Sequence, residues 1–163
     1  MSVMRQMELF CRPVGGEFDL PHLMAIHRYL FQDVCGWAGE TRTVDIAKGG
    51  SRFGSYHFIS SYLKSIFSKL AEERKSWNRS FRDGDLSGRL AEYLGEINAV
   101  HPFREENGRT QRVFIGELAA AHGLVIRWDR MTPGEMLEAS IASFGGNNVL
   151  LRDLIQRCSH EEP

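Results

Sequence analysis

The sequence has few cysteines, no long hydrophobic run and no excess of either charge. Its three cysteines, Cys11, Cys35 and Cys158, are an odd number without Cys-x-x-Cys spacing. This usage is typical of reduced thiols in a cytoplasm-like compartment, so we expect no disulfide. No apolar stretch approaches the roughly 18 residues of a membrane-spanning helix, and residues 1–11 lack the apolar core and cleavage site of a signal peptide. We therefore expect a soluble, cytoplasmic protein without a membrane partner.

The positive and negative charges of the chain are balanced, so its net charge does not indicate a polyanionic partner. Lysine and arginine together number 20, aspartate and glutamate 21, and the formal net charge is −1. This balance gives no general reason to expect direct binding of nucleic acid or an anionic membrane. A chain of 163 residues is one domain by length and buries roughly 70% of its unfolded surface on folding, so its core needs no cross-links to be stable.

Common metal and nucleotide motifs are also missing. His22 and His27 are five residues apart and fall on different faces of a helix, and no His, Cys and Asp cluster has zinc spacing. The Gly-Gly pairs lack the strand, the spacing and the lysine of a P-loop or a Rossmann turn. These absences exclude a zinc enzyme of that type and the two common glycine-rich phosphate loops.

Hydrophobic periodicity predicts a mostly helical chain. Residues 1–18 are weakly patterned, and we treat them as an irregular lead-in. The linker 77–85 contains Asp83-Gly84, a turn signal. The expected helices run from Asp19 to the stop at Gly36, over 60–74, from Leu86 into His101, from Gly108 onward, from Pro133 behind a Thr132 cap, and over 149–157.

The block 42–58 is different in kind. Residues 43–46 alternate like a strand, residues 48–51 (KGGS) form a turn, and residues 52–58 can return as a second strand. The sequence therefore predicts one β-hairpin in an otherwise helical chain.

The run 101–112, HPFREENGRTQR, precedes an apolar helical pattern and contains the types of residue that bind a nucleoside triphosphate. Asn107 is a good N-cap for the helix that follows. The unpaired first-turn N–H groups and the helix dipole form an anion site, to which Arg109 and Arg112 add two forked cationic groups.

Two further side chains of this run supply reactive chemistry. Glu105 can hold a magnesium ion that the phosphates also bind. His101 is placed to take a proton from an incoming hydroxyl. Taken alone, such a histidine is more often a helix cap or a core residue, and Arg109 and Arg112 could be solvated helix-face charges. Cations are nevertheless disfavoured at the positive end of the dipole by a few tenths of a kcal/mol, and a bound polyanion would explain them.

The run resembles the signature of Fic-domain proteins, His-x-Phe-x-(Asp/Glu)-(Gly/Ala)-Asn-(Gly/Lys)-Arg-x-x-Arg. The matching positions are His101, Phe103, Glu105, Asn107, Gly108, Arg109 and Arg112. Glu106 departs, because the family has Gly or Ala there. Residues 27–45, HRYLFQDVCGWAGETRTVD, are similar to the helix and Trp-Ala-Gly segment that lead into the Fic hairpin. The resemblance implies an all-α Fic fold, a helical bundle with a β-hairpin flap, over 19–158 with a C-terminal tail over 159–163.

The resemblance also implies a protein adenylyltransferase, which transfers AMP from ATP to a Tyr, Ser or Thr hydroxyl of a target protein. His101 would be the general base and Glu105 would ligate Mg²⁺ on the α- and β-phosphates. Asn107 would position the α-phosphate, while the Gly108 backbone and Arg109 would hold the β-phosphate. Arg112 would hold the γ-phosphate, and Phe103 would anchor the loop in the core. The other nucleotide-binding candidates are Lys48, Gly49, Glu106, Thr110, Gln111, Asn147 and Asn148. The candidates in the flap, which would grip the target as an added strand, are Val44, Asp45, Ile46, Ser51, Arg52 and Phe53.

Two alternative functions stay open on the same residues. Gly108, rather than Lys, is similar to the AMP-transferring group, and a Fic kinase or phosphocholine transferase is the runner-up. Glu106 also leaves a non-catalytic binding module open. Its three possible effects are a left-handed backbone strain, a negative charge beside the triphosphate, and an ion pair with Arg109 or Arg112.

Regulation is inferred from a missing motif. Many Fic proteins carry an inhibitory helix with Ser/Thr-x-x-x-Glu-(Gly/Asn), but Ser143 leads to Asn147-Asn148 without that glutamate. By resemblance to members whose inhibitory helix lies on a separate protein, we expect a bacterial toxin with a small antitoxin. Type II topoisomerase subunits are typical targets in that group. A secreted effector with further domains would have the same sequence features.

Overall fold

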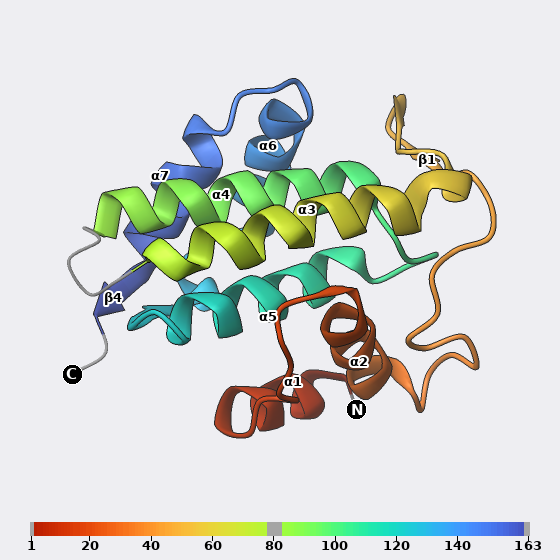
Figure 1. Cartoon of the computed structure of the whole chain (residues 1–163), viewed down its shortest axis with the longest axis horizontal. Helices are drawn as coiled ribbons and strands as arrows, with labels where there is room; N and C mark the ends of the chain where they lie inside the picture. Colours follow the sequence, from red (N-terminus) through yellow and green to blue (C-terminus); the bar gives the residue numbers. More distant parts are fainter. Residues whose placement is uncertain (1, 78–82, 162–163) are drawn as a thin grey trace.

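The computed structural model describes residues 2–77 and 83–161, and this part of the chain is mostly helical (Figure 1). Helix α4 packs against α3, α5 and α7, while α5 also contacts α2 and α6 lies on α7. The helices are α1 (Ser2–Cys11), α2 (Leu20–Phe31), α3 (Ile59–Glu73), α4 (Asp83–Val100), α5 (Asn107–Ala120), α6 (Pro133–Phe144) and α7 (Val149–Cys158).

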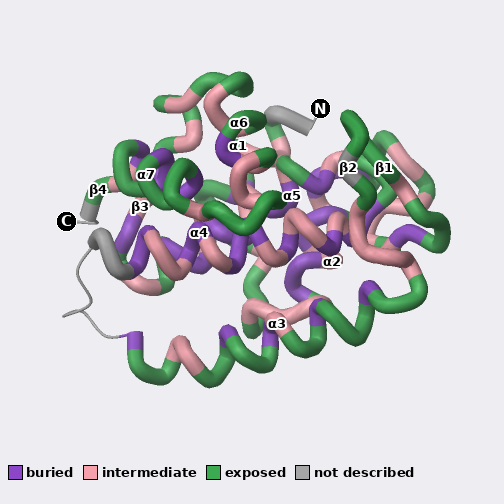
Figure 2. The backbone as a smooth tube through the Cα atoms, turned by 90° about the horizontal axis from the view of Figure 1, so that it is seen from above, coloured by how far each residue is buried: buried purple, intermediate pink, exposed green. Residues whose placement is uncertain are grey.

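Helices α4 and α5 form the centre of the bundle. Leu90, Leu94 and Ile97 recur along one face of α4 and are buried, as are Phe114 and Leu118 of α5. Each such side chain contributes about 1.5–3 kcal/mol by leaving water. Figure 2 shows buried positions along both helices and an exposed outer side on α3. Because only residues 101–106 join α4 to α5, the loop that they form is fixed at one end of the core.

The β-hairpin predicted between the helices is confirmed, but its strands are shorter than predicted. Strand β1 (Ala47–Lys48) pairs antiparallel with β2 (Ser51–Arg52). Gly49 and Gly50 make the turn with φ of +57° and +83°, which glycine adopts without strain. Residues 43–46 and 53–58 are not strands, although the Phe53 N–H donates to the Ile46 carbonyl at 3.3 Å. The Gly54 N–H donates instead to the Ala99 carbonyl near the end of α4, and the Tyr56 N–H donates to the Asp45 side chain. Residues 56–58 form a short 3-10 helix, η1 (Tyr56–Phe58).

The sequence predicted an irregular lead-in over residues 1–18. This prediction is wrong for Ser2–Cys11, which form helix α1. This helix is held by tertiary contacts rather than by local signals. Leu9 is buried, and the Tyr29 hydroxyl of α2 donates to Glu8 at 2.8 Å. Helix α2 begins where predicted, since Asp19 Oδ1 accepts the His22 N–H at 2.9 Å.

Two other predictions are also corrected. Asp83 and Gly84, predicted as a turn, lie in the first turn of α4, and residues 78–82 of the predicted linker lie outside the described residues. Residues 159–161 of the predicted tail form β4 (Ser159–Glu161), which pairs antiparallel with β3 (Leu124–Ile126). The sequence missed this sheet because its two strands are more than thirty residues apart. Two further 3-10 turns are η2 (Arg74–Ser76) and η3 (Trp128–Arg130).

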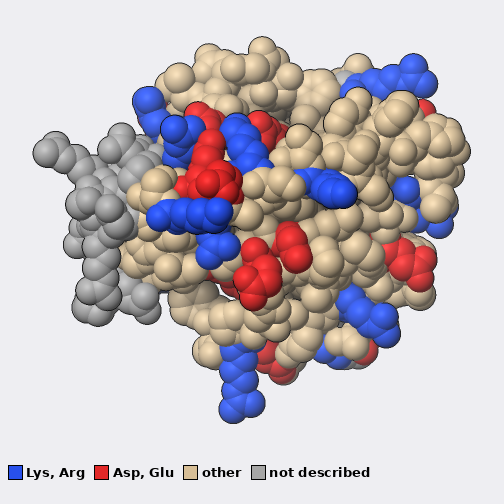
Figure 3. Space-filling view, in the orientation of Figure 1, with Lys and Arg blue, Asp and Glu red and all other residues tan. Residues whose placement is uncertain are grey.

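Several predicted features agree with the structure. Thr132 and Glu135 form the predicted capping box at the start of α6. Cys11, Cys35 and Cys158 are free thiols. No helix in the described residues is both long and apolar enough to cross a membrane. Figure 3 shows basic and acidic side chains interleaved on one face, as the near-zero net charge predicts.

Candidate active site at the α4–α5 loop

The loop from His101 to Glu106 turns the chain between α4 and α5. His101 has a φ of +50° and Glu106 a φ of +62°, so both are in the left-handed region. A non-glycine residue there costs on the order of 1 kcal/mol or more, and such strain persists only where the surroundings fix it. Phe103, fully buried as predicted, anchors the middle of the loop in the core.

Asn107 closes the loop around Phe103 and does not cap the helix. Its Oδ1 accepts the Phe103 N–H at 2.9 Å, and its Nδ2 donates to the Phe103 carbonyl at 2.8 Å. Asn107 is the first helical residue, and Glu106 stands at the N-cap position without a side-chain cap bond. The N-cap prediction is therefore wrong, since the buried amide is used to hold the loop. One Nδ2 hydrogen remains for a ligand.

His27 of α2 supports the same loop by hydrogen bonding and stacking. Its Nδ1 lies 2.8 Å from the Gly39 N–H and accepts from it, so the proton is on Nε2, which donates to the Glu105 carbonyl at 3.3 Å. Its ring stacks on Phe103 with 4.0 Å between centroids. Burial lowers the pKa of His27, which keeps the ring neutral. Sequence reasoning missed this role, although a histidine on the apolar face of a helix is a signal for it.

His101 is a neutral base with one free nitrogen. Its Nδ1 lies 3.3 Å from the Asn98 carbonyl, and because a carbonyl only accepts, Nδ1 carries the proton. Nε2 is left as the acceptor. Burial lowers the pKa of His101 to about 4, the Asn98 carbonyl opposes this, and the charges of Arg42 and Lys48 add to the lowering. Phe53 of the hairpin stacks on the ring, with centroids 3.9 Å apart.

The first turn of α5 presents the phosphate-binding candidates. Its leading N–H groups have no partner within the helix. Gly108 is exposed, and a Cβ added there would meet the Arg112 guanidinium at 3.4 Å. Burial lowers the pKa of Arg112, and within residues 2–77 and 83–161 no carboxylate pairs with this arginine. The backbone and Arg112 are therefore candidates for holding an anion next to the loop.

Arg109 is already engaged in the same turn. Its Nε lies 2.7 Å from Glu106 Oε2, and its terminal nitrogen lies 2.6 Å from Oε1. The guanidinium also lies over the Phe31 ring at 5.1 Å. Of the three effects predicted for Glu106, two are visible here, the left-handed backbone and the pairing with Arg109.

The remaining nucleotide-binding candidates fall into two groups. Thr110 and Gln111 are buried, and Thr110 Oγ1 donates to the Glu106 carbonyl at 3.1 Å, so the Thr110 side chain supports the loop from inside. Gln111 Nε2 is buried and has no hydrogen-bond partner among the described residues. Asn147 Oδ1 accepts the Val149 N–H at 3.0 Å, and Asn148 Oδ1 accepts from Ser143 at 2.6 Å. Both asparagines hold the turn before α7, away from the motif loop in sequence.

The hairpin candidates lie beside His101. Lys48 and Gly49 are exposed at the tip, and Lys48 contributes positive charge at the imidazole. Phe53 bridges His101 and Phe144, whose ring it meets edge-on at 5.7 Å. Val44 and Asp45 are exposed and Ile46 is half-buried. Arg42, directly before the hairpin, was missed by sequence reasoning.

Glu105 has the exposure and chemistry of a magnesium ligand. Its carboxylate is exposed beside the phosphate-binding turn. The described residues contain no group of three or more His, Cys, Asp or Glu that could hold a metal ion. Mg²⁺ in nucleotide sites needs only one or two carboxylates, because the phosphates and water complete its octahedron. The residues present therefore fit such an ion.

Comparison with protein families matches residues 17–119 to the model of the Fic/DOC family. The chain is 47% identical over 156 residues to protein adenylyltransferase VbhT of Bartonella schoenbuchensis, a match that covers 96% of this chain and 32% of that protein. It is 35% identical over 142 residues to a probable protein adenylyltransferase Fic of Salmonella typhimurium, covering 87% of this chain and 70% of the relative. The chain thus spans about a third of VbhT and over two thirds of the Salmonella protein.

Two solved structures share the fold closely. BepC of Bartonella tribocorum, a VirB-translocated effector with bound AMPPNP, superposes with a TM-score of 0.91 at 25% identity, covering 99% of this chain and 84% of that one. The N-terminal Fic domain of a putative cell filamentation protein of Bartonella quintana, with bound ADP, gives a TM-score of 0.91 at 26% identity, covering 99% and 82%.

Proposed function

Since this chain belongs to the Fic/DOC family, we propose that it is a protein adenylyltransferase, which moves AMP from ATP onto a Tyr, Ser or Thr hydroxyl of another protein. One observation carries the proposal. His101 is neutral, with its proton on Nδ1, and the same short loop leads into the N-terminal part of a helix that bears Arg112, with which no carboxylate of the described residues pairs. Relatives named as adenylyltransferases and neighbours that hold AMPPNP or ADP support it.

In the proposed reaction the target hydroxyl attacks the α-phosphorus of ATP. A bond forms between the hydroxyl oxygen and phosphorus, the bond to the bridging oxygen breaks, and pyrophosphate leaves. His101 Nε2 takes the hydroxyl proton. A positioned base of this kind contributes about 10²–10⁴ in rate, and it must be unprotonated at the working pH. The lowered pKa of His101 meets that condition.

The phosphates would be held by charge and by backbone donors. The first-turn N–H groups of α5 and the Arg112 guanidinium would neutralise the phosphate tail, and Arg109 would join them once its pair with Glu106 opens. Glu105 would hold Mg²⁺, which when bound spreads and neutralises the charge that develops on the phosphates. Positioning and charge neutralisation of this kind supply most of the catalysis in phosphate transfer.

The target would bind at the hairpin flap. Val44 and Asp45 are exposed and Ile46 is half-buried, and an extended segment of the target would add to this edge as a strand. Main-chain hydrogen bonds would give affinity without strict sequence demands. This arrangement would carry a target hydroxyl to His101 Nε2.

We further propose a bacterial toxin or effector controlled by a partner. Residues 1–163 contain no Ser/Thr-x-x-x-Glu-(Gly/Asn) motif, and a small antitoxin would supply the inhibitory helix. A type II topoisomerase subunit is the proposed target for a cytoplasmic toxin. BepC is described as a VirB-translocated effector, so translocation into another cell is the alternative location.

A labelling experiment separates the proposed function from its rivals. The protein is incubated with a bacterial lysate and ATP labelled at either the α- or the γ-phosphate, and the labelled band is identified by mass spectrometry. Transfer of the α-label alone supports adenylylation, and transfer of the γ-label supports the phosphotransferase.

Absence of transfer from either label would favour a binding module. That second candidate has an observation of its own, the Glu106–Arg109 pair, which occupies an arginine that the triphosphate would need. A His101→Ala variant run in parallel shows which labelled bands depend on this site.

A further inference from the structure

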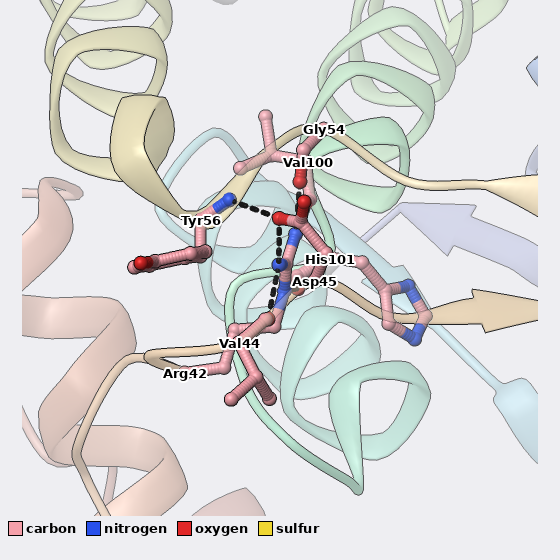
Figure 4. A network of polar contacts seen from close by, with 7 residues as sticks. All are labelled: Arg42, Val44, Asp45, Gly54, Tyr56, Val100 and His101. Atoms are coloured by element: carbon pink, nitrogen blue, oxygen red, sulfur yellow. Dashed lines mark hydrogen bonds and ion pairs between the residues drawn. The ribbon is translucent and has the colours of Figure 1, made fainter.

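Arg42 lies outside the motif, and its side chain is nevertheless buried at the joint between the hairpin and α4. It donates to four backbone carbonyls: His101 from Nε at 2.8 Å, Val44 at 2.7 Å, Val100 at 3.0 Å and Gly54 (Figure 4). Its own N–H donates to the Pro102 carbonyl at 2.8 Å.

The four acceptors belong to two separate parts of the site. Val44 and Gly54 flank the hairpin on its two sides, whereas Val100 and His101 end α4 and begin the motif loop. A guanidinium is planar and presents five N–H donors in a fixed fork, so it holds its acceptors at set positions relative to one another. The Arg42 side chain therefore links the hairpin flap to the backbone of His101, the proposed general base.

The surroundings of Arg42 indicate that its side chain fixes the positions of its carbonyl partners and does not only stabilise the fold. The nearest carboxylate, Asp45, lies 3.8 Å away and is 41% exposed, while the Arg42 side chain is fully buried. Its charge is thus compensated by carbonyl groups. Burying a charge costs several kcal/mol, and an apolar side chain of similar size is often as stabilising. What an apolar side chain cannot do is set the spacing of four carbonyls.

The carbonyl of His101 is the most informative acceptor. His101 has a left-handed φ of +50°, a conformation that must be held by its surroundings. Arg42 bonds the carbonyl of that residue, and in Figure 4 the imidazole points away from the network, clear of the guanidinium. The contact therefore holds the His101 backbone without a hydrogen bond to the imidazole.

We propose that Arg42 is a positioning residue for AMP transfer, which fixes the target-binding hairpin and the general base His101 at one mutual distance by donating to both. The inference rests on the proposed function, since it assumes that the target lies on the hairpin. Arg42 acts through the backbone and touches neither the nucleotide nor the target.

The test compares Arg42→Lys with a matched control, Arg74→Lys. Arg74 is half-buried, lies 4.3 Å over the Phe18 ring and bonds His122 at 3.3 Å, remote from the hairpin. Lysine keeps the charge in both variants and removes the fork. For Arg42→Lys we expect kcat for transfer to fall about 100-fold, because a misplacement near 1 Å has that effect.

Two further readouts separate positioning from loss of folded protein. The Kd for ATP should stay within twofold while KM for the target rises, whereas partial unfolding would lower the active fraction and leave both unchanged. Hydrogen exchange should accelerate together in residues 44–56 and 99–101. Arg74→Lys should leave kcat and both segments unchanged. A kcat for Arg42→Lys within threefold of the parent overturns the proposal.

If Arg42→Lys does not fold, hydrogen exchange measured on the unaltered protein tests the proposal instead. If Arg42 links the two segments, the hairpin amides and those of 99–101 should open as one unit, with the same dependence on denaturant. Independent opening of the two segments overturns the proposal. These exchange measurements do not need transfer activity, so a parent protein that transfers no AMP would refute the proposed function and leave this result standing.

Discussion

Glu106 and Arg109 form a two-pronged ion pair in the first turn of α5, with Arg109 Nε 2.7 Å from Oε2 and the second contact 2.6 Å long. The pair stands where the resemblance expects a small residue and a phosphate-binding arginine. Both side chains are about one-third exposed, so the pair is accessible to solvent and can open when a more highly charged anion arrives.

Replacing Glu106 by glycine should raise the rate of AMP transfer by roughly tenfold or more, which corresponds to about 1.4 kcal/mol at the barrier. Glycine accepts the φ of +62° without strain, frees Arg109 and removes a negative charge beside the triphosphate. The rate is measured at saturating Mg-ATP with no inhibitor present. Glu106→Ala is the matched control, because it removes the carboxylate and keeps the left-handed strain. Equal or lower activity in the glycine variant would mean that Glu106 serves the reaction.

His101→Ala should abolish transfer while ATP binding and the melting temperature change little. The substitution removes the base, and the phosphate-binding turn of α5 does not depend on the imidazole. Binding is followed by calorimetric titration and transfer by α-labelled ATP. A variant that still modifies its target near the parent rate would refute the role given to His101.

The pH dependence of transfer should follow the depressed pKa of His101, about 4 in the folded protein. The acidic limb of kcat/KM should lie well below pH 6.5, the range of an ordinary histidine. A limb centred near 6.5 would contradict the neutral, buried imidazole.

The same pKa has a consequence for stability. A histidine whose folded pKa is lowered binds fewer protons than the unfolded chain between its two pKa values, so stability falls as pH drops from about 6.5 toward 4. Below 4 its contribution becomes constant. Urea unfolding at several pH values should show a shallower slope in His101→Ala than in the parent. Burial also lowers the pKa of His27 and His122, so both contribute dependence in the same direction.

Arg112→Ala should weaken ATP binding about tenfold or more, since hydrogen bonds to charged groups contribute about 1.5–3 kcal/mol. Stability should change little, because no carboxylate in the described residues pairs with this guanidinium, and the bond from Trp128 Nε1 to the Arg112 carbonyl, 3.0 Å long, survives the substitution. Unchanged nucleotide affinity together with a lowered melting temperature would make Arg112 a structural residue. Arg152→Ala, which removes an exposed pair with the adjacent Asp153, is a suitable control.

Local signals in the sequence determined the elements whose determinants lie within a few residues. Asp19 caps α2, Thr132 and Glu135 cap α6, and Gly49-Gly50 turns the hairpin, because each of these interactions closes within four residues. The order of functional groups in 101–112 likewise followed from the sequence, since a single loop and helix turn carries them all.

Tertiary structure alone decided the features that depend on distant contacts. Helix α1 has weak local signals and is held by α2, and β4 exists because Ser159–Glu161 meet β3. Asn107 left its predicted cap position because Phe103, buried by the whole bundle, offered its backbone to the amide. The Arg42 network joins residues up to 59 positions apart, and the free energy of such contacts appears only after the chain has closed the intervening loops. No window of the sequence contains that information, and only the folded chain brings the flap and the base together.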